Sequence, residues 1–378
     1  MRGTHTSRST RRRTTVVATA AVVVVAAVVV GVAMRRSSGG GPGRAAPTAP
    51  ASTATTTPAP GAAGGLPGPT GAPGIALGVY VKPGGGSDLE AAVGGFESSI
   101  GRRLSIIQTF TGWETSSGAP VPFPTAFAAY VEGIGATPMI TWQPEQAVTA
   151  TQAPGGTLAD QPAFSLAQLS SGRYDAYIRT WAGAARSFGR PVYVRMMHEM
   201  NDRTYPWSIG VNGNVGSDDY VAAWRHIVDV FRAVGATNVQ FVWCVGAKPA
   251  TPDPAAYFPG DGYASWIALD GYNRGTPWQS FTSIMGPAYA DITAISALPV
   301  MIAETGSVDR PGDPTAKADW ITSALDSEIP QSLPRVRAVL YFDAPGRGFS
   351  YALSSSTQAL HAFAAVAGSA GYQATPQA

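Results

Sequence analysis

The sequence is poor in cysteine, histidine and charge. Of its 378 residues one is cysteine, four are histidine and 13% are charged, with a formal net charge of +2. A single cysteine excludes an intramolecular disulfide, so the folded part must depend on the size of its hydrophobic core. The weak charge argues against a nucleic-acid partner. We expect Cys244, within the apolar run VQFVWCV, to be a small buried side chain.

Several motifs of other enzyme classes are missing. The sequence has no H-x-x-x-H pair, no G-x-S-x-G and no G-x-G-x-x-G after its first apolar run. These absences argue against a helix-borne zinc site, a serine nucleophile elbow and a dinucleotide-binding fold. We therefore predict no metal and no cofactor.

The N-terminal region, residues 1–36, has the features of an export segment. Residues 16–34 are an uncharged Val/Ala-rich stretch, preceded by Arg11, Arg12 and Arg13. At about 1.5 Å per residue this stretch nearly spans a bilayer as a helix. A cleaved signal peptide and a retained membrane anchor both fit, and the arginines also permit a twin-arginine signal. Each alternative places the rest of the chain outside the cell.

Residues 37–74 are rich in Gly, Pro, Ala and Thr and show no apolar periodicity. Such a segment cannot bury enough surface to offset the entropy of ordering it, which predicts a disordered linker. The catalytic domain is expected over 75–372.

Eight short runs in this domain are rich in β-branched and aromatic residues and alternate with segments of helical period. The runs are 75–81, 104–110, 137–142, 191–197, 239–245, 266–272, 299–305 and 336–342. The clearest helix covers 217–235, with Ser217 as its N-cap and Gly235 at its end, and others are expected at 88–101, 171–189 and 313–327. This order predicts a single (β/α)₈ barrel, an α/β fold, ahead of an open doubly wound sheet.

Two glutamates end apolar runs on the predicted fourth and seventh strands. Glu199 lies in HEMN and Glu304 in AETG. The C-terminal ends of barrel strands face the active site, so these carboxyl groups could face each other across a sugar. A pair of carboxyl groups on either side of a glycosidic bond performs hydrolysis, with retention or inversion decided by their separation.

The segments VRMMHEMN (194–201), TYPW (204–207) and IAETG (302–306) resemble the family-26 glycoside hydrolases, which are retaining (β/α)₈ barrels. The resemblance implies that Glu199 is the general acid/base and Glu304 the nucleophile. It also implies that His198 and Trp207 line the sugar subsite and that Tyr272 touches the nucleophile. The segment YFDAPGRG (341–348) departs from the family's pattern.

Further candidates come from their positions. Arg195 is another candidate for the substrate site, and we expect it to point into the barrel and pair with a carboxylate. We expect Asn201 to contact the sugar or Glu199 rather than to cap a loop. Strand alternation turns His198 away from the side that Glu199 faces. An alternative interpretation is therefore that His198 is a buried, hydrogen-bonded histidine that does not contact the sugar. The aromatic side chains at the rim are expected to stack on sugars, although core packing is an alternative for Trp243. They are Trp113, Trp142, Trp207 and Trp243.

These features predict a monomeric retaining endo-β-glycanase that cleaves an extracellular polysaccharide. The resemblance makes β-1,4-mannan the first substrate, with mixed-linkage β-glucan and β-1,3-xylan as alternatives. A carbohydrate-binding barrel without catalysis is the rival from another class. We expect the segments 145–170 and 201–217 to border the cleft.

Overall fold

The computed structural model describes residues 74–82, 89–147, 159–247, 253–346 and 348–372. Among them, no helix has both the length and the apolar character that crossing a bilayer requires. The predicted export segment lies outside these residues, and so does the predicted linker apart from Gly74.

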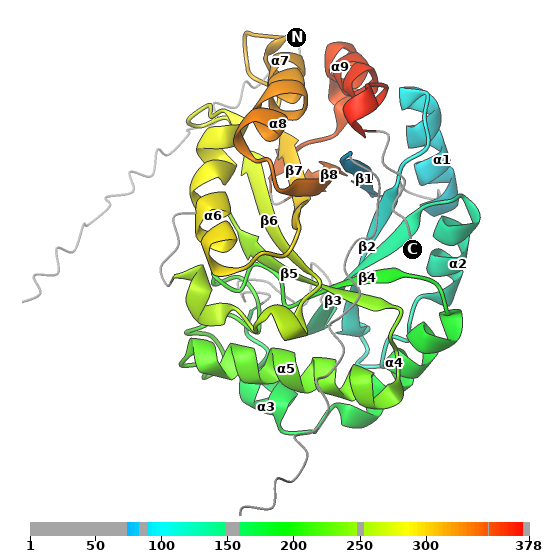
Figure 1. The fold of residues 1–378 in the computed structure, drawn as a ribbon, viewed down its shortest axis with the longest axis vertical. Helices are drawn as coiled ribbons and strands as arrows, with labels where there is room; N and C mark the ends of the chain where they lie inside the picture. Colours follow the sequence, from blue (N-terminus) through cyan, green and yellow to red (C-terminus); the bar gives the residue numbers. More distant parts are fainter. Residues whose placement is uncertain (1–73, 83–88, 148–158, 248–252, 347, 373–378) are drawn as a thin grey trace, which may run out of the picture. The chain divides into compact units, whose positions relative to one another are not determined.

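Within this part of the chain, eight parallel strands form a closed barrel in sequence order, and helices surround it (Figure 1). The strands are β1 (Ala76–Val81), β2 (Ile106–Glu114), β3 (Thr137–Gln146), β4 (Val192–Met196), β5 (Val239–Gly246), β6 (Trp266–Asn273), β7 (Val300–Ser307) and β8 (Val336–Asp343). Pairing of β1 with β8, from Ala76 with Ala338 to Val81 with Asp343, closes the barrel. The predicted (β/α)₈ barrel is confirmed.

Helices connect successive strands of the barrel, and a last helix follows β8. The α-helices are α1 (Leu89–Ile100), α2 (Thr125–Gly133), α3 (Leu166–Ser170), α4 (Asp175–Phe188), α5 (Ser217–Val234), α6 (Phe281–Ile295), α7 (Ala316–Thr322), α8 (Ile329–Ser332) and α9 (Thr357–Ala367). A π-helical turn, η4 (Ser323–Glu328), joins α7 to α8, and a short hairpin, β9 (Pro345–Gly346) and β10 (Phe349–Ser350), follows β8. Short 3₁₀ turns are η1 (Pro162–Phe164), η2 (Pro254–Tyr257), η3 (Asp261–Tyr263), η5 (Leu353–Ser355) and η6 (Ala370–Tyr372).

The ends of α5 show how local chemistry sets the helix bounds. Gly216, not Ser217, occupies the N-cap position, so the predicted cap was wrong by one residue. The reason is that Asp219 reaches back and accepts the backbone N–H of Gly216 at 3.3 Å, which satisfies the helix start without a serine cap. At the other end Gly235 adopts φ 78°, the left-handed conformation that the prediction assigned to it.

Two other predicted helices begin later than the sequence pattern indicated. Residues 171–174 form a turn, and α4 begins at Asp175. The segment expected at 313–327 becomes helical at Ala316.

Alternation along each strand produces two apolar layers. One cluster fills the barrel interior and includes Ile106, Met139 and Cys244, all fully buried. The other lies between the strands and the helices and contains Trp181, Trp224 and Trp320. Cys244 is buried as predicted.

We expect Trp181→Ala to destabilise the fold by about 3–5 kcal/mol, because a large side chain is lost from a closely packed layer. Trp181 is 1% exposed, stacks on Trp142 with ring centroids 4.5 Å apart and meets the edge of Phe123. Urea unfolding measures the loss, with Trp278→Ala as the control because Trp278 is only half-buried. A loss for Trp181 no larger than that of the control would contradict the packing described.

Candidate active site

A buried guanidinium joins three strands at the C-terminal end of the barrel. Arg195 at the end of β4 donates from Nη1 to Asp270 Oδ2 on β6 and from Nη2 to Glu304 Oε1 on β7. The side chains of Arg195 and Asp270 are fully buried, and that of Glu304 is 9% exposed. The third donor, Nε, reaches Thr141 Oγ1 on β3 at 3.0 Å.

The charges in this cluster shift one another's protonation. Burial lowers the pKa of Arg195, but Asp270 and Glu304 outweigh burial and raise it well above its usual value. Burial raises the pKa of Asp270 well above its usual value, against the opposing effect of Arg195. A single guanidinium thus pairs with two carboxyl groups in a buried environment, where charged groups are destabilised.

Arg195 points into the barrel and pairs with a carboxylate there, as its strand parity predicted. Because it has no exposed surface, it acts on the carboxylates and not directly on a sugar. Its assignment as a substrate contact is therefore corrected.

Both oxygens of Glu304 have a donor. Arg195 serves Oε1, and the Tyr272 hydroxyl on β6 donates to Oε2. Burial, then the charge of Glu304, raises the pKa of Tyr272 well above its usual value, so the hydroxyl keeps its proton and remains a donor. Two donors on one carboxylate fix its orientation.

Glu199 lies on a strained turn beyond β4. The strand ends at Met196, and Met197 and Glu199 adopt φ values of 44° and 48°. Positive φ at a residue other than glycine costs of order 1–3 kcal/mol and tends to occur at active sites. The Glu199 backbone N–H donates to Cys244 O at 2.9 Å, and the Tyr205 hydroxyl donates to Glu199 Oε2 at 3.2 Å.

The same turn corrects the predicted orientation of His198. Strand alternation does not continue past Met196, so His198 and Glu199 border the same cavity. His198 Nε2 lies 3.1 Å from the Tyr205 hydroxyl, which also contacts Glu199. Tyr205, in the motif TYPW, thus links the two side chains, although it was not predicted as a site residue.

The cavity above the barrel has a volume of about 710 Å³ and is bordered by both Glu199 and Glu304. Much of its remaining wall is aromatic: Tyr80, Phe110, Tyr272, Phe342, Phe349 and Tyr351. Most of these were missed, although Tyr80, Phe110 and Phe342 lie near the ends of apolar runs, which is the signal that could have identified them. The described parts of the two predicted loops contribute Glu145, Asp202, Thr204 and Tyr205.

The predicted stacking tryptophans do not border this cavity. Trp113, Trp142, Trp207 and Trp243 are each 1% exposed or less, which rules out an open face for sugar in this structure. For two of them the reason is strand alternation: Thr141 and Cys244 point inward to Arg195. Their neighbours therefore point outward, Trp142 to Phe231 of α5 and Trp243 to Phe258.

Trp207 and Asn201 have supporting roles instead of the predicted sugar contacts. Trp207 stacks on Tyr205 with centroids 4.7 Å apart and donates from Nε1 to His198 O at 2.8 Å. The Asn201 amide donates to Gly246 O at 2.8 Å and accepts from Gly246 N at 2.9 Å. Asn201 therefore ties the turn to the end of β5, which is the loop-capping role that was the alternative to a sugar contact.

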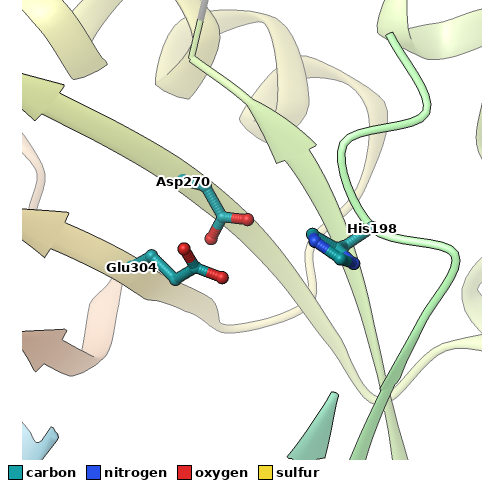
Figure 2. A group of neighbouring side chains, drawn as sticks. All are labelled: His198, Asp270 and Glu304. Atoms are coloured by element: carbon teal, nitrogen blue, oxygen red, sulfur yellow. The ribbon is translucent and has the colours of Figure 1, made fainter. Parts of the chain in front are cut away.

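His198, Asp270 and Glu304 place one ligand atom each within 4.8 Å of the others (Figure 2). Such a group could hold a metal ion. However, Asp270 and Glu304 already share the guanidinium of Arg195, so a dication would have to bind beside a buried positive charge. The arrangement favours carboxylate chemistry over a metal centre.

We expect Arg195→Met to destabilise the fold by about 3–5 kcal/mol near neutral pH, because it leaves buried carboxylates without their counter-charge. The loss should be smaller at about pH 4. Burial already raises the pKa of Asp270, and a carboxyl group with a raised pKa in the folded state weakens the fold as pH rises above its unfolded value, about 3.9. Urea unfolding at both pH values measures this difference.

The control for that experiment is Arg179→Met, since Arg179 forms an ion pair with Asp175 at the surface. Its effect should be small at both pH values. Equal losses for Arg195→Met at the two pH values would contradict the charge assignment.

The region that carries the motifs matches a known family. The family model described as glycosyl hydrolase family 26 matches residues 167–316. Endoglucanase H of Acetivibrio thermocellus is 33% identical over 299 residues, which cover 77% of this chain and 30% of that protein. The β-1,3-xylanase TXYA of a Vibrio species is 32% identical over 104 residues, 27% of this chain and 21% of that protein. The chain spans less than a third of the length of these relatives.

Solved structures share the fold at low identity. The catalytic domain of a Bacillus sp. JAMB-750 endo-β-1,4-mannanase is 16% identical with a TM-score of 0.61, covering 80% of this chain and 88% of that chain. A modular endo-β-1,4-mannanase from Cellulomonas fimi is 17% identical with a TM-score of 0.55, covering 79% of this chain and 71% of that chain. The motifs, the closed barrel and these matches together show that the chain belongs to glycoside hydrolase family 26.

Proposed function

We propose that this chain is a retaining endo-β-glycanase in which Glu304 is the nucleophile and Glu199 the general acid/base. The observation that carries the proposal is the environment of Glu304. Arg195 and Tyr272 hold both of its oxygens, which is what an anionic nucleophile requires before it attacks.

The reaction has two steps. Glu304 attacks the anomeric carbon while Glu199 gives its proton to the leaving oxygen, and the bond between the sugars breaks as the glycosyl ester forms. Glu199 then removes a proton from water, which attacks the anomeric carbon and releases Glu304. The hydroxyl of Tyr205 orients the carboxyl group of Glu199 at 3.2 Å in both steps.

The aromatic wall supports a polysaccharide substrate. Tyr80, Phe110 and Phe342 pack against one another, with centroids of Tyr80 4.8 Å from each of the other two. They present apolar surface beside the two glutamates, and sugar rings have C–H faces that stack on such surfaces. A purely binding role would leave the pair of glutamates and the buried cation without a purpose.

Among substrates, we place β-glucan before the β-1,4-mannan that the sequence resemblance suggested. The reason is that the 33% identical relative is named an endoglucanase. The mannanase structures are 16% and 17% identical, and such low identity supports a shared fold but not a shared substrate. β-1,3-Xylan is supported by matches over 104 residues.

We further propose that the barrel acts outside the cell. The uncharged stretch 16–34 and the basic residues before it support export, by cleavage or as an anchor. We propose that the enzyme is a monomer with no cofactor.

We expect the protein to release reducing sugars from at least one of mixed-linkage β-glucan, β-1,4-mannan and β-1,3-xylan. Glu199→Ala should lower kcat on the polymer by roughly 10²–10⁴, the range of general acid–base catalysis. Glu304→Ala should abolish turnover, because no covalent intermediate can form. Circular dichroism checks that the variants fold. A folded wild type that is inactive on the whole panel would favour the binding barrel, and an active Glu304→Ala would indicate different chemistry.

Azide distinguishes the two glutamates. With an activated aryl glycoside, azide should restore turnover of Glu199→Ala and give the β-glycosyl azide, because it attacks the glycosyl ester without needing a general base. With Glu304→Ala the same anion should replace the nucleophile and give the α-azide. Nuclear magnetic resonance of the products assigns their configuration. The reverse pattern would exchange the roles of the two residues.

A further inference from the structure

A buried lysine on α7 holds the chain that follows the short hairpin. Lys317 is 1% exposed, and its ammonium group donates to Ala352 O at 2.7 Å and to Ser355 Oγ at 2.9 Å. The Ser355 hydroxyl donates in turn to Ala352 O at 2.8 Å. A carboxylate oxygen of Asp309 lies 3.8 Å from the ammonium nitrogen. Lys317 thus holds the chain directly after Tyr351.

Two residues of β8 hold the same stretch from the other side. Asp343, at the end of the strand, accepts the backbone N–H of Leu353 at Oδ1 over 2.6 Å. The hydroxyl of Tyr341 donates to Tyr351 O at 2.9 Å. The chain from Tyr351 onward is therefore held by both the barrel and α7.

Burial of the ammonium group is unfavourable by itself. Burial lowers the pKa of Lys317, while the charges of Asp309 and Asp343 oppose that shift. An apolar side chain of similar size would fill the same space without giving up the hydration of a charge. What it would lack is the three hydrogen-bond donors of an ammonium group. The presence of a lysine is therefore explained by the backbone that it holds.

Tyr351 connects this stretch to the proposed nucleophile. Its ring stacks on Tyr272 with centroids 4.5 Å apart and an interplanar angle of 26°. Tyr351 also lies against β7, because a side chain at Gly306 would begin 2.9 Å from its Cβ atom. The Tyr272 hydroxyl donates to Glu304. A displacement of Tyr351 would therefore disturb the phenol that holds one oxygen of Glu304.

We propose that Lys317 is a positioning residue for the nucleophile Glu304 and acts through Tyr272. By holding the segment 352–355, it keeps Tyr351 stacked on Tyr272. The hydroxyl of Tyr272 then stays on the carboxylate of Glu304. Lys317 does not border the cavity that contains both glutamates, so its effect on catalysis must pass through the chain that it holds. This inference rests on the proposed function.

A double-mutant cycle between Lys317 and Tyr272 tests the proposal. The substrates are the dinitrophenyl β-glycosides of cellobiose, mannobiose and β-1,3-xylobiose, and the one that the wild type hydrolyses fastest is used. Dinitrophenolate leaves without a general acid, so kcat/KM reports the attack by Glu304.

Lys317→Met keeps an unbranched side chain but removes the donors, and it should lower kcat/KM about tenfold in the otherwise wild-type protein, within the range for residues coupled through shared contacts. In Tyr272→Phe, which has no hydroxyl to displace, the same substitution should lower kcat/KM less than about twofold. A lysine that acted independently of Tyr272 would lower kcat/KM by the same factor in both proteins.

The matched control is Ile321→Ala, since Ile321 is a buried side chain of the same helix that does not border the cavity. It should lower the urea midpoint, because a packed side chain is lost, and leave kcat/KM unchanged. Ser355→Ala removes one acceptor of the ammonium group from an exposed position. It should show the pattern of Lys317→Met with a smaller fall, about threefold, and it decides the question where Lys317→Met does not fold.

Three results would overturn the role of Lys317: no fall in kcat/KM, an equal fall in both proteins of the cycle, or a comparable fall with Ile321→Ala. A wild type that hydrolyses none of the three glycosides would instead overturn the proposed function.

Discussion

The guanidinium of Arg195 is the charge on which the rest of the site depends. It is fully buried and touches carboxyl groups on two other strands, Asp270 on β6 and Glu304 on β7. Taking three charged groups out of water is costly, and an apolar cluster of the same volume would stabilise a barrel at least as well. The arrangement is explained by what it positions: Glu304 is held at the rim with a donor on each of its oxygens.

The two glutamates acquire different properties from different backbones. Glu304 belongs to β7, where the pairing with β6 and β8 shifts register, and charged and phenolic donors hold both of its oxygens. Glu199 follows the end of β4 with positive φ, and a neutral hydroxyl from Tyr205 contacts it. An acid and a nucleophile require different environments around two otherwise identical side chains.

The eight apolar runs predicted the barrel because strand length, β-branched content and alternation with helices are local properties. Helix starts were less predictable: Asp219 replaced the expected serine cap of α5 through a contact that depends on the turn before it. The tryptophans near strand ends were wrongly predicted to stack on sugars, because the alternation of side chains along each strand was not used to decide which way they point. Thr141 faces the barrel interior, so Trp142 beside it must face the helices. The motif marked the region of the site but not the direction of each side chain.

The sequence by itself determined the barrel and the two strands that carry the glutamates, since both follow from patterns that a strand or helix needs for its own formation. Only the tertiary structure decided what surrounds them. Closure of the barrel brings Arg195 to Asp270 and Glu304, residues 75 and 109 positions away in the chain. The turn after Met196 places His198 beside Glu199 against strand alternation. Such contacts depend on distances between elements, which no local pattern of residues specifies.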